Sequence, residues 1–185
     1  MWENTILAHL YSIKGSILLA DIHRLLLEQG IIKRDIKKTI DSALQSGLIA
    51  KDGKRSYKLG KNAMLYEGTL VQHPKGFGFI SEAKSISSNP KLKKDPFISP
   101  SNMASAHHGD TVLVRVIRVR RDDRPESTIL TVLSRGADTI TGIFASEKEG
   151  GMVYPDDPRF PFTIRVDRNS AKDAQEGDAV IVKIQ

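Results

Sequence analysis

The sequence of 185 residues contains no cysteine, so disulfide bonds, thiolate metal sites and cysteine nucleophiles are all excluded. It also has no apolar run that approaches the roughly 18 residues of a membrane-spanning helix. Its first four residues, Met1-Trp2-Glu3-Asn4, lack the basic segment and apolar stretch of a secretion signal. We therefore expect a soluble cytoplasmic protein without a membrane partner.

Motifs of catalysis and cofactor binding are missing as well. The sequence has no Gly-x-x-x-x-Gly-Lys phosphate loop, no dinucleotide-binding fingerprint and no heptad array. Its five histidines show neither metal-ligand spacing nor the pattern of a Ser-His-Asp triad. We therefore predict no catalytic residue, no metal and no cofactor in this chain.

Charge is distributed unevenly along the chain. Residues 1–66 hold eleven basic and six acidic residues, a net charge of +5, and residues 67–136 hold eleven and seven, a net charge of +4. Residues 137–185 hold six and nine, a net charge of −3. Two basic thirds attract phosphate groups through counterion release, although surface charge of this kind also serves solubility alone.

The first third is predicted to be helical. Apolar residues at helical spacing indicate helices over residues 3–11, 18–29 and 34–46. Gly30 and Gly47 follow the second and third helices as terminating residues.

A hairpin follows these helices. Residues 48–51 and 56–59 alternate as strands around the turn signal Asp52-Gly53. Three helices and a hairpin predict a winged helix-turn-helix over residues 1–62.

The rest of the chain is predicted to be β-structure. Strands are expected at residues 68–72, 77–81, 96–99, 111–119 and 128–133, and then at 139–144, 151–154, 162–166 and 179–184. The first five suit a small OB-type barrel over residues 66–136, with mobile loops at 83–95 and 120–126.

The strand pattern begins again in the last third. Gly109-Asp110 and Gly177-Asp178 each precede an apolar strand, which indicates a weak internal repeat. A second barrel over residues 137–185 therefore lacks its fifth strand, and we expect that a longer protein or a partner supplies it. The predicted fold class is multidomain α+β.

The run Lys75-Gly76-Phe77-Gly78-Phe79-Ile80 carries the clearest functional signal. Alternation along a strand places Phe77 and Phe79 on one face, and Ile80 turns inward. Two exposed phenyl rings form a platform for unpaired bases, Phe97 extends it, and Lys75 meets a phosphate. The alternative is that these rings belong to the barrel core.

The motifs of the barrel resemble those of a known protein family. The run from Lys75 to Ile80 resembles the RNP1-like motif of cold-shock domains, and Asp95-Pro96-Phe97-Ile98 resembles their RNP2 strand. With the run from Val153 to Phe160 and the order of the modules, the whole chain resembles the N-terminal region of the bacterial ribonuclease II/R family, in its ribonuclease R branch.

The resemblance implies a function in RNA degradation. Such a region captures single-stranded RNA, and also structured RNA, and guides it to a processive 3′→5′ exoribonuclease domain that uses Mg²⁺. That domain is absent from these residues, so the chain alone is not expected to cut RNA. Association with an RNA helicase or with the ribosome is a further expectation.

The sequence departs from the cold-shock pattern at the platform. The first strand has no tryptophan, and His73 is expected to replace it in part by stacking. In the second barrel, Gly150-Gly151-Met152-Val153-Tyr154 stands where Gly-Phe-Gly-Phe would be, which predicts weaker binding. The adjacent carboxylates of Asp156 and Asp157 are expected to form a turn rather than a metal site.

Other basic residues are candidates for phosphate contacts. On the fourth strand of the first barrel they are Arg115 and Arg118, and in the helical third they are Lys33, Arg34, Lys37, Lys38, Lys54 and Arg55. Two alternatives to an exoribonuclease fragment stay open: a free-standing RNA chaperone and a DNA-binding winged-helix regulator.

Overall fold

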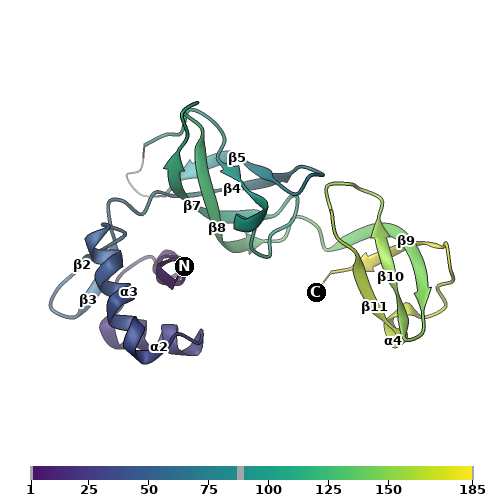
Figure 1. Cartoon of the computed structure of the whole chain (residues 1–185), viewed down its shortest axis with the longest axis horizontal. Coiled ribbons are helices and arrows are strands. Elements are labelled where there is room, and N and C mark those ends of the chain that lie inside the picture. The colour runs from purple at the N-terminus through teal and green to yellow at the C-terminus, as the bar shows by residue number, and fades with distance from the viewer. Residues whose placement is uncertain (1, 87–89, 185) are drawn as a thin grey trace.

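A computed structural model describes residues 2–86 and 90–184 of the chain, which form three successive parts (Figure 1). A helical part with a small sheet is followed by a closed five-stranded barrel and then by an open four-stranded sheet. The architecture is therefore α+β, and the barrel and the open sheet are both OB-like.

The helical part contains three helices and three short strands. They are α1 (Trp2–Ile13), β1 (Ile17–Leu18), α2 (Leu19–Glu28), α3 (Lys33–Gln45), β2 (Ile49–Lys51) and β3 (Ser56–Leu59). Both predicted glycine ends are confirmed, because Gly30 and Gly47 have φ values of 87° and 71°. Sequence reasoning missed β1, which adds to the hairpin and makes the sheet order β1-β3-β2.

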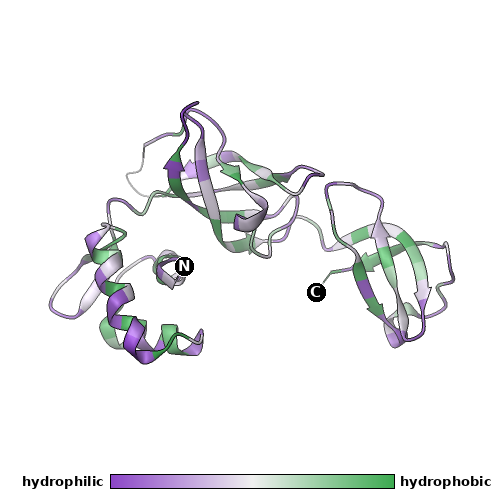
Figure 2. Ribbon diagram, viewed as in Figure 1, coloured by the Kyte–Doolittle hydropathy of each residue, from purple (hydrophilic) through white to green (hydrophobic). Residues whose placement is uncertain are grey.

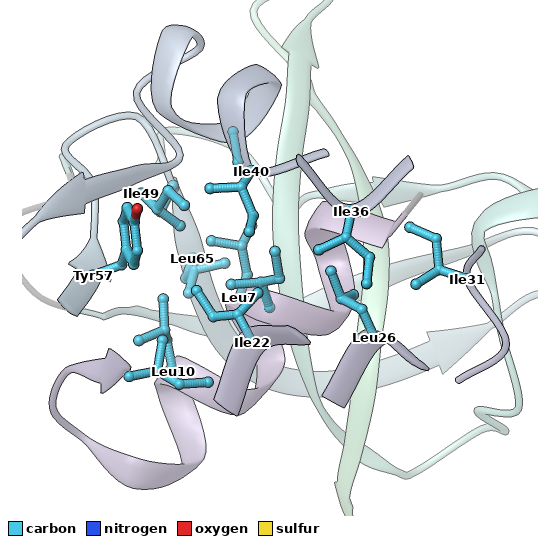
Figure 3. Close-up of a cluster of buried hydrophobic side chains, with 14 of the residues drawn as sticks. Leu7, Leu10, Ile22, Leu26, Ile31, Ile36, Ile40, Ile49, Tyr57 and Leu65 are labelled. Atoms are coloured by element: carbon cyan, nitrogen blue, oxygen red, sulfur yellow. The ribbon is translucent and has the colours of Figure 1, made fainter. Parts of the chain in front are cut away.

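The core of the helical part comes from one face of each helix. Figure 2 shows hydrophobic and hydrophilic residues alternating along α3, and its buried residues are Ile36, Thr39, Ile40 and Ala43. This is the spacing of a helix with one apolar stripe. Figure 3 shows Leu7, Ile22 and Leu26 meeting in the same cluster.

This core continues into the barrel. Leu65 and Leu113 of the barrel are buried in the same cluster, with Leu130 and Leu133 packed against it. The hydroxyl of Tyr11 on α1 donates to Oε2 of Glu67 on the barrel, at 3.0 Å. The helical part is therefore joined to the barrel by apolar packing and a hydrogen bond.

The barrel has five strands. They are β4 (Leu65–Gln72), β5 (Gly78–Ser85), β6 (Phe97–Ile98), β7 (Thr111–Val119) and β8 (Pro125–Ser134), with a short 3₁₀ helix η1 (Pro100–Asn102) after β6. The closed order is β4-β5-β6-β8-β7, in which β6 and β8 are parallel and the other described pairs are antiparallel. Because β5 runs to Ser85, the expected loop begins later than residue 83, and its residues 87–89 lie outside the described residues.

The open sheet repeats four strands of the barrel. It consists of β9 (Thr139–Glu147), β10 (Gly150–Pro155), β11 (Ile164–Asp167) and β12 (Ala179–Lys183), with the short helix α4 (Arg168–Ala171) after β11. Its order is β11-β10-β9-β12, which corresponds to β6-β5-β4-β7. The described residues contain no counterpart of β8 in this sheet.

Backbone hydrogen bonds confirm the predicted repeat. Gly109 N–H donates to the carbonyl of Leu70 at 2.8 Å, and Gly177 N–H donates to that of Phe144 at 2.9 Å. Both glycines have positive φ, at 87° and 85°. The Gly-Asp pairs therefore form the same turn before β7 and before β12.

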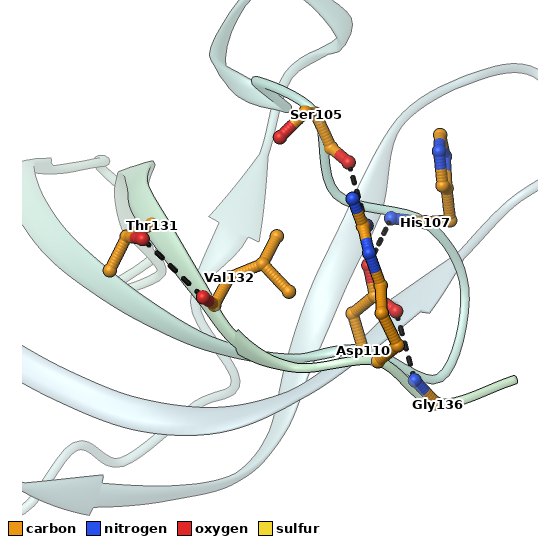
Figure 4. A network of polar contacts seen from close by, with 7 residues as sticks. Ser105, His107, Asp110, Thr131, Val132 and Gly136 are labelled. Carbon is orange, nitrogen blue, oxygen red and sulfur yellow. Dashed lines mark hydrogen bonds and ion pairs between the residues drawn. The ribbon is translucent and has the colours of Figure 1, made fainter. Parts of the chain in front are cut away.

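A buried carboxylate organises the end of the barrel nearest the open sheet (Figure 4). Asp110 is 2% exposed, and its Oδ2 accepts from the backbone N–H of His107 at 2.9 Å and from Nη1 of Arg135 at 2.6 Å. Its Oδ1 accepts from the N–H of Gly136 at 3.0 Å. The His107 ring lies 4.7 Å from that of Phe162 in the open sheet part. Asp110 thus binds the backbone of Gly136, where the chain leaves the barrel, and the backbone of His107, whose ring contacts the open sheet part.

Among the described residues, every helix is too short or too polar to span a bilayer.

Candidate nucleic-acid interface

The strands β4, β5 and β6 place phenyl rings on the outside of the barrel. Val71 pairs with Phe79, and Phe79 pairs with Phe97, so the three side chains form one row across the strands. Their neighbours Ile80 and Ile98 are 0% exposed and fill the core. Because side chains alternate along a strand, Phe79 and Phe97 point outward, and Val71 beside them is 41% exposed.

Two glycines allow this hairpin to form. Gly76 has a φ of 85°, and its N–H donates to the carbonyl of His73 at 2.8 Å in the turn between β4 and β5. Gly78 faces inward, where an added Cβ would lie 2.8 Å from a Leu70 methyl group and 3.0 Å from the Val71 carbonyl oxygen. The glycines therefore serve the turn and the close approach of two strands.

Four rings gather at this surface, and we call His73, Phe77, Phe79 and Phe97 the aromatic cluster. The three phenyl centroids are 5.7–5.8 Å apart, and the imidazole of His73 stacks on Phe77 at 4.4 Å with an interplanar angle of 9°. The phenyl rings are half-buried and His73 is exposed. The structure thus brings together the four aromatic residues that the sequence predicted, outside the core.

Two arginines that sequence reasoning did not select lie over this cluster. Cζ of Arg124 is 5.0 Å from the centroid of Phe79, and Cζ of Arg120 is 5.5 Å from that of Phe97. Both distances are within the range of cation–π attraction. The segment was expected only to be a loop, and nothing local in the sequence shows that the β7–β8 turn reaches β5 and β6.

The basic residues predicted for the barrel occupy three different environments. Lys75 is exposed in the turn beside His73. Arg118 is exposed on β7, and its Nη2 lies 2.7 Å from Oε2 of Glu126. Arg115 is partly buried, and burial lowers the pKa of its guanidinium while the charge of Glu3 on α1 opposes that change. Arg115 therefore faces the helical part and is separate from the aromatic cluster.

The candidates in the helical part lie on two elements outside the barrel. Four exposed cations lie at the start of α3, and two more lie in the turn between β2 and β3. These residues are Lys33, Arg34, Lys37, Lys38, Lys54 and Arg55. Three of the four on α3 share one face of the helix, at positions i, i+3 and i+4.

Among the described strands of the open sheet, Tyr154 is the one exposed aromatic residue. Tyr154 on β10 is 54% exposed, but glycines occupy the preceding positions 150 and 151. Asp157 binds Arg159 through contacts of 2.6–3.0 Å, and this pairing keeps the pKa of the Asp157 carboxyl below its usual value. In the described part of the chain, no group of three or more His, Asp or Glu residues could hold a metal ion.

The fold and this surface define an OB-type barrel protein with a candidate interface for single-stranded nucleic acid. Residues 68–132 match the family model of the ribonuclease B OB domain. The chain is 28% identical over 152 residues to ribonuclease R of Acidithiobacillus ferrooxidans and 27% identical over 149 residues to ribonuclease R of Escherichia coli. Each of these matches covers 80% of this chain. The chain is thus similar to ribonuclease R, as its motifs predicted.

The match covers only part of these relatives. The chain spans 33% of the Acidithiobacillus protein and 18% of the Escherichia protein. The solved structure of the apo form of Mycoplasma genitalium ribonuclease R superposes with a TM-score of 0.52 at 22% identity, over 64% of this chain and 18% of that chain. This likeness shows a shared fold.

Proposed function

We propose that this chain is the RNA-binding N-terminal region of a ribonuclease R-like 3′→5′ exoribonuclease. In this proposal, residues 1–62 form a winged helix-turn-helix, and residues 66–136 and 137–185 form two cold-shock domains. The catalytic domain and its Mg²⁺ belong to a part of the enzyme outside these 185 residues. The relationship to ribonuclease R and the exposed aromatic cluster support the proposal.

The aromatic cluster carries the argument. Three phenyl rings of one barrel face lie within 6 Å of one another and outside the core. Aromatic faces stack on unpaired bases of any sequence, and basic groups around them hold the phosphates. Bases within a duplex are already stacked on each other, so this surface selects single strands. It captures RNA and presents it to the catalytic domain without reading a sequence.

The experiment compares two double variants of the whole chain for binding to a labelled oligouridylate. Phe77→Ala with Phe79→Ala removes two rings of the cluster, and each ring is worth about 1–3 kcal/mol per stacked base. We expect a loss of about 2 kcal/mol or more, which is roughly 30-fold in Kd. Circular dichroism checks that the variant remains folded.

The matched control is Tyr154→Ala with Ile181→Ala, which removes two apolar side chains, 54% and 73% exposed, from the open sheet. We expect it to bind within about threefold of the unchanged chain. Equal affinity of a folded Phe77→Ala, Phe79→Ala chain would refute base stacking at the cluster. An equal loss in both double variants would show that binding is not centred on the cluster.

The exposed cations of α3 favour a second binding function. Lysines and arginines at this spacing meet phosphates along a duplex but read few bases. We propose that the helical part engages structured RNA, with duplex DNA as the alternative substrate. Equal affinity for duplexes of unrelated sequence supports the first, and a strong preference for one DNA sequence supports a regulator. An RNA helicase or the ribosome is a further partner to be tested on this surface.

A further inference from the structure

We propose that Arg120 and Arg124 cover the aromatic cluster in the free protein and move to the phosphates when single-stranded RNA stacks on the rings. This inference rests on the proposed function and adds two RNA-binding residues to it. In this proposal, the two arginines of the β7–β8 turn contact the rings in the free protein and contact phosphates in the complex with RNA.

The arginines and a nucleobase compete for the same space. Stacked aromatic systems place their centroids about 4.5–7 Å apart. Cζ of Arg124 already lies 5.0 Å from the Phe79 centroid, and Cζ of Arg120 lies 5.5 Å from that of Phe97. A base can stack on either ring only after the guanidinium above it has moved aside.

Within the described residues 2–86 and 90–184, neither guanidinium group forms a close ion pair with a carboxylate. Other arginines of the chain form close ion pairs, such as Arg118 with Glu126 at 2.7 Å and Arg135 with Asp110 at 2.6 Å. Arg124 has only a loose pair with Asp122 at 3.8 Å, and among the described residues Arg120 has no ion pair. Phosphate oxygens can therefore replace the ring contact without breaking a strong ion pair.

The backbone beneath these side chains is held in place. The N–H of Arg120 donates to the carbonyl of Arg124 at 2.9 Å, and the N–H of Asp123 donates to the carbonyl of Arg120 at 3.0 Å. Nζ of Lys94, in the segment before β6, donates to the carbonyl of Asp122. Since this turn is anchored, the exchange needs only rotation of long side chains that begin beside the rings.

The test measures the salt dependence of oligouridylate binding for the whole chain. The variant Arg120→Gln with Arg124→Gln keeps a polar, unbranched side chain at both positions and removes both charges. Each phosphate contact contributes about 0.7 to the slope of log K against log salt for single strands. We expect the variant to bind more weakly and its slope to be shallower by about 1.4.

The matched control is Arg121→Gln with Lys84→Gln, which removes two exposed cations of the same barrel. Neither residue has a described contact with a ring of the cluster, so we expect a slope close to that of the unchanged chain. An unchanged slope for the Arg120, Arg124 variant, or tighter binding, would overturn the assignment. An equal decrease in both variants would also overturn it, because the effect would then be general charge.

Nuclear magnetic resonance tests the exchange itself. In the free chain, ring currents shift the side-chain protons of Arg120 and Arg124, and we expect RNA to abolish these shifts. Persistence of both shifts at saturating RNA would overturn the exchange. If Phe77→Ala with Phe79→Ala weakens binding but the arginine variant does not, only this inference fails; if the phenyl variant binds normally, the proposed function fails.

Discussion

Replacing Asp110 by asparagine tests the role of the buried carboxylate most directly. The side chain keeps its shape but loses its charge, and one of its two oxygens becomes an NH₂ group that cannot accept a hydrogen bond. The new amide can take two orientations. In the more favourable one, its oxygen still faces the N–H of His107 and the guanidinium of Arg135. The new NH₂ group then faces the N–H of Gly136, and two donors oppose each other.

The loss of stability follows from these contacts. A hydrogen bond to a charged group is worth about 1.5–3 kcal/mol, and a buried donor without a partner costs about 1–3 kcal/mol. Breaking a buried ion pair by removing one charge costs about 3–5 kcal/mol. The half-exposed side chain of Arg135 can reach water, so we expect a loss near the lower end, about 3 kcal/mol.

Urea denaturation followed by circular dichroism measures this loss. Asp122→Asn is the control, because Asp122 is exposed and lies 3.8 Å from Arg124, and it is expected to change stability by about 0.5 kcal/mol or less. A loss below about 1 kcal/mol for Asp110→Asn would show that the network does not stabilise the barrel. If that variant does not fold, Arg135→Gln provides the measurement, with an expected loss of about 1–3 kcal/mol.

Three other predictions concern the core, the joint of the first two parts and pH. Gly78→Ala should cost at least about 1 kcal/mol in urea denaturation, because its Cβ would lie 3.0 Å from a backbone oxygen; unchanged stability would show that the strands can separate there. Tyr11→Phe should cost about 1 kcal/mol by removing the hydrogen bond to Glu67, and no loss in a thermal melt would contradict this contact. Burial lowers the folded-state pKa of both His107 and His108 below 6.5. As the pH falls below that value, the unfolded chain binds protons before the folded chain does, so the stability of the fold should decrease. Imidazole titrations by NMR with pKa values at or above 6.5 would refute this.

The prediction of the fold succeeded where the signal was local. The glycines after α2 and α3 and the Asp-Gly hairpin turn reflect backbone conformations that only certain residues adopt at low cost, so they can be found from sequence. The strand Thr111–Val119 was predicted with both ends correct because its apolar run is long. The two-residue strand β1 was missed, because it forms only through its pairing with Tyr57 and Ser56 on β3.

For the candidate interface, the sequence alone determined which rings share a face, and the structure showed that this face lies outside the core. The alternation of side chains and the glycine between the phenyls place Phe77 and Phe79 on one face. Tertiary structure decided that Arg120 and Arg124 lie over those rings and that Arg115 faces α1. The physical reason is that alternation depends on adjacent residues, whereas contacts between distant segments depend on barrel closure, here through the parallel pairing of β6 with β8.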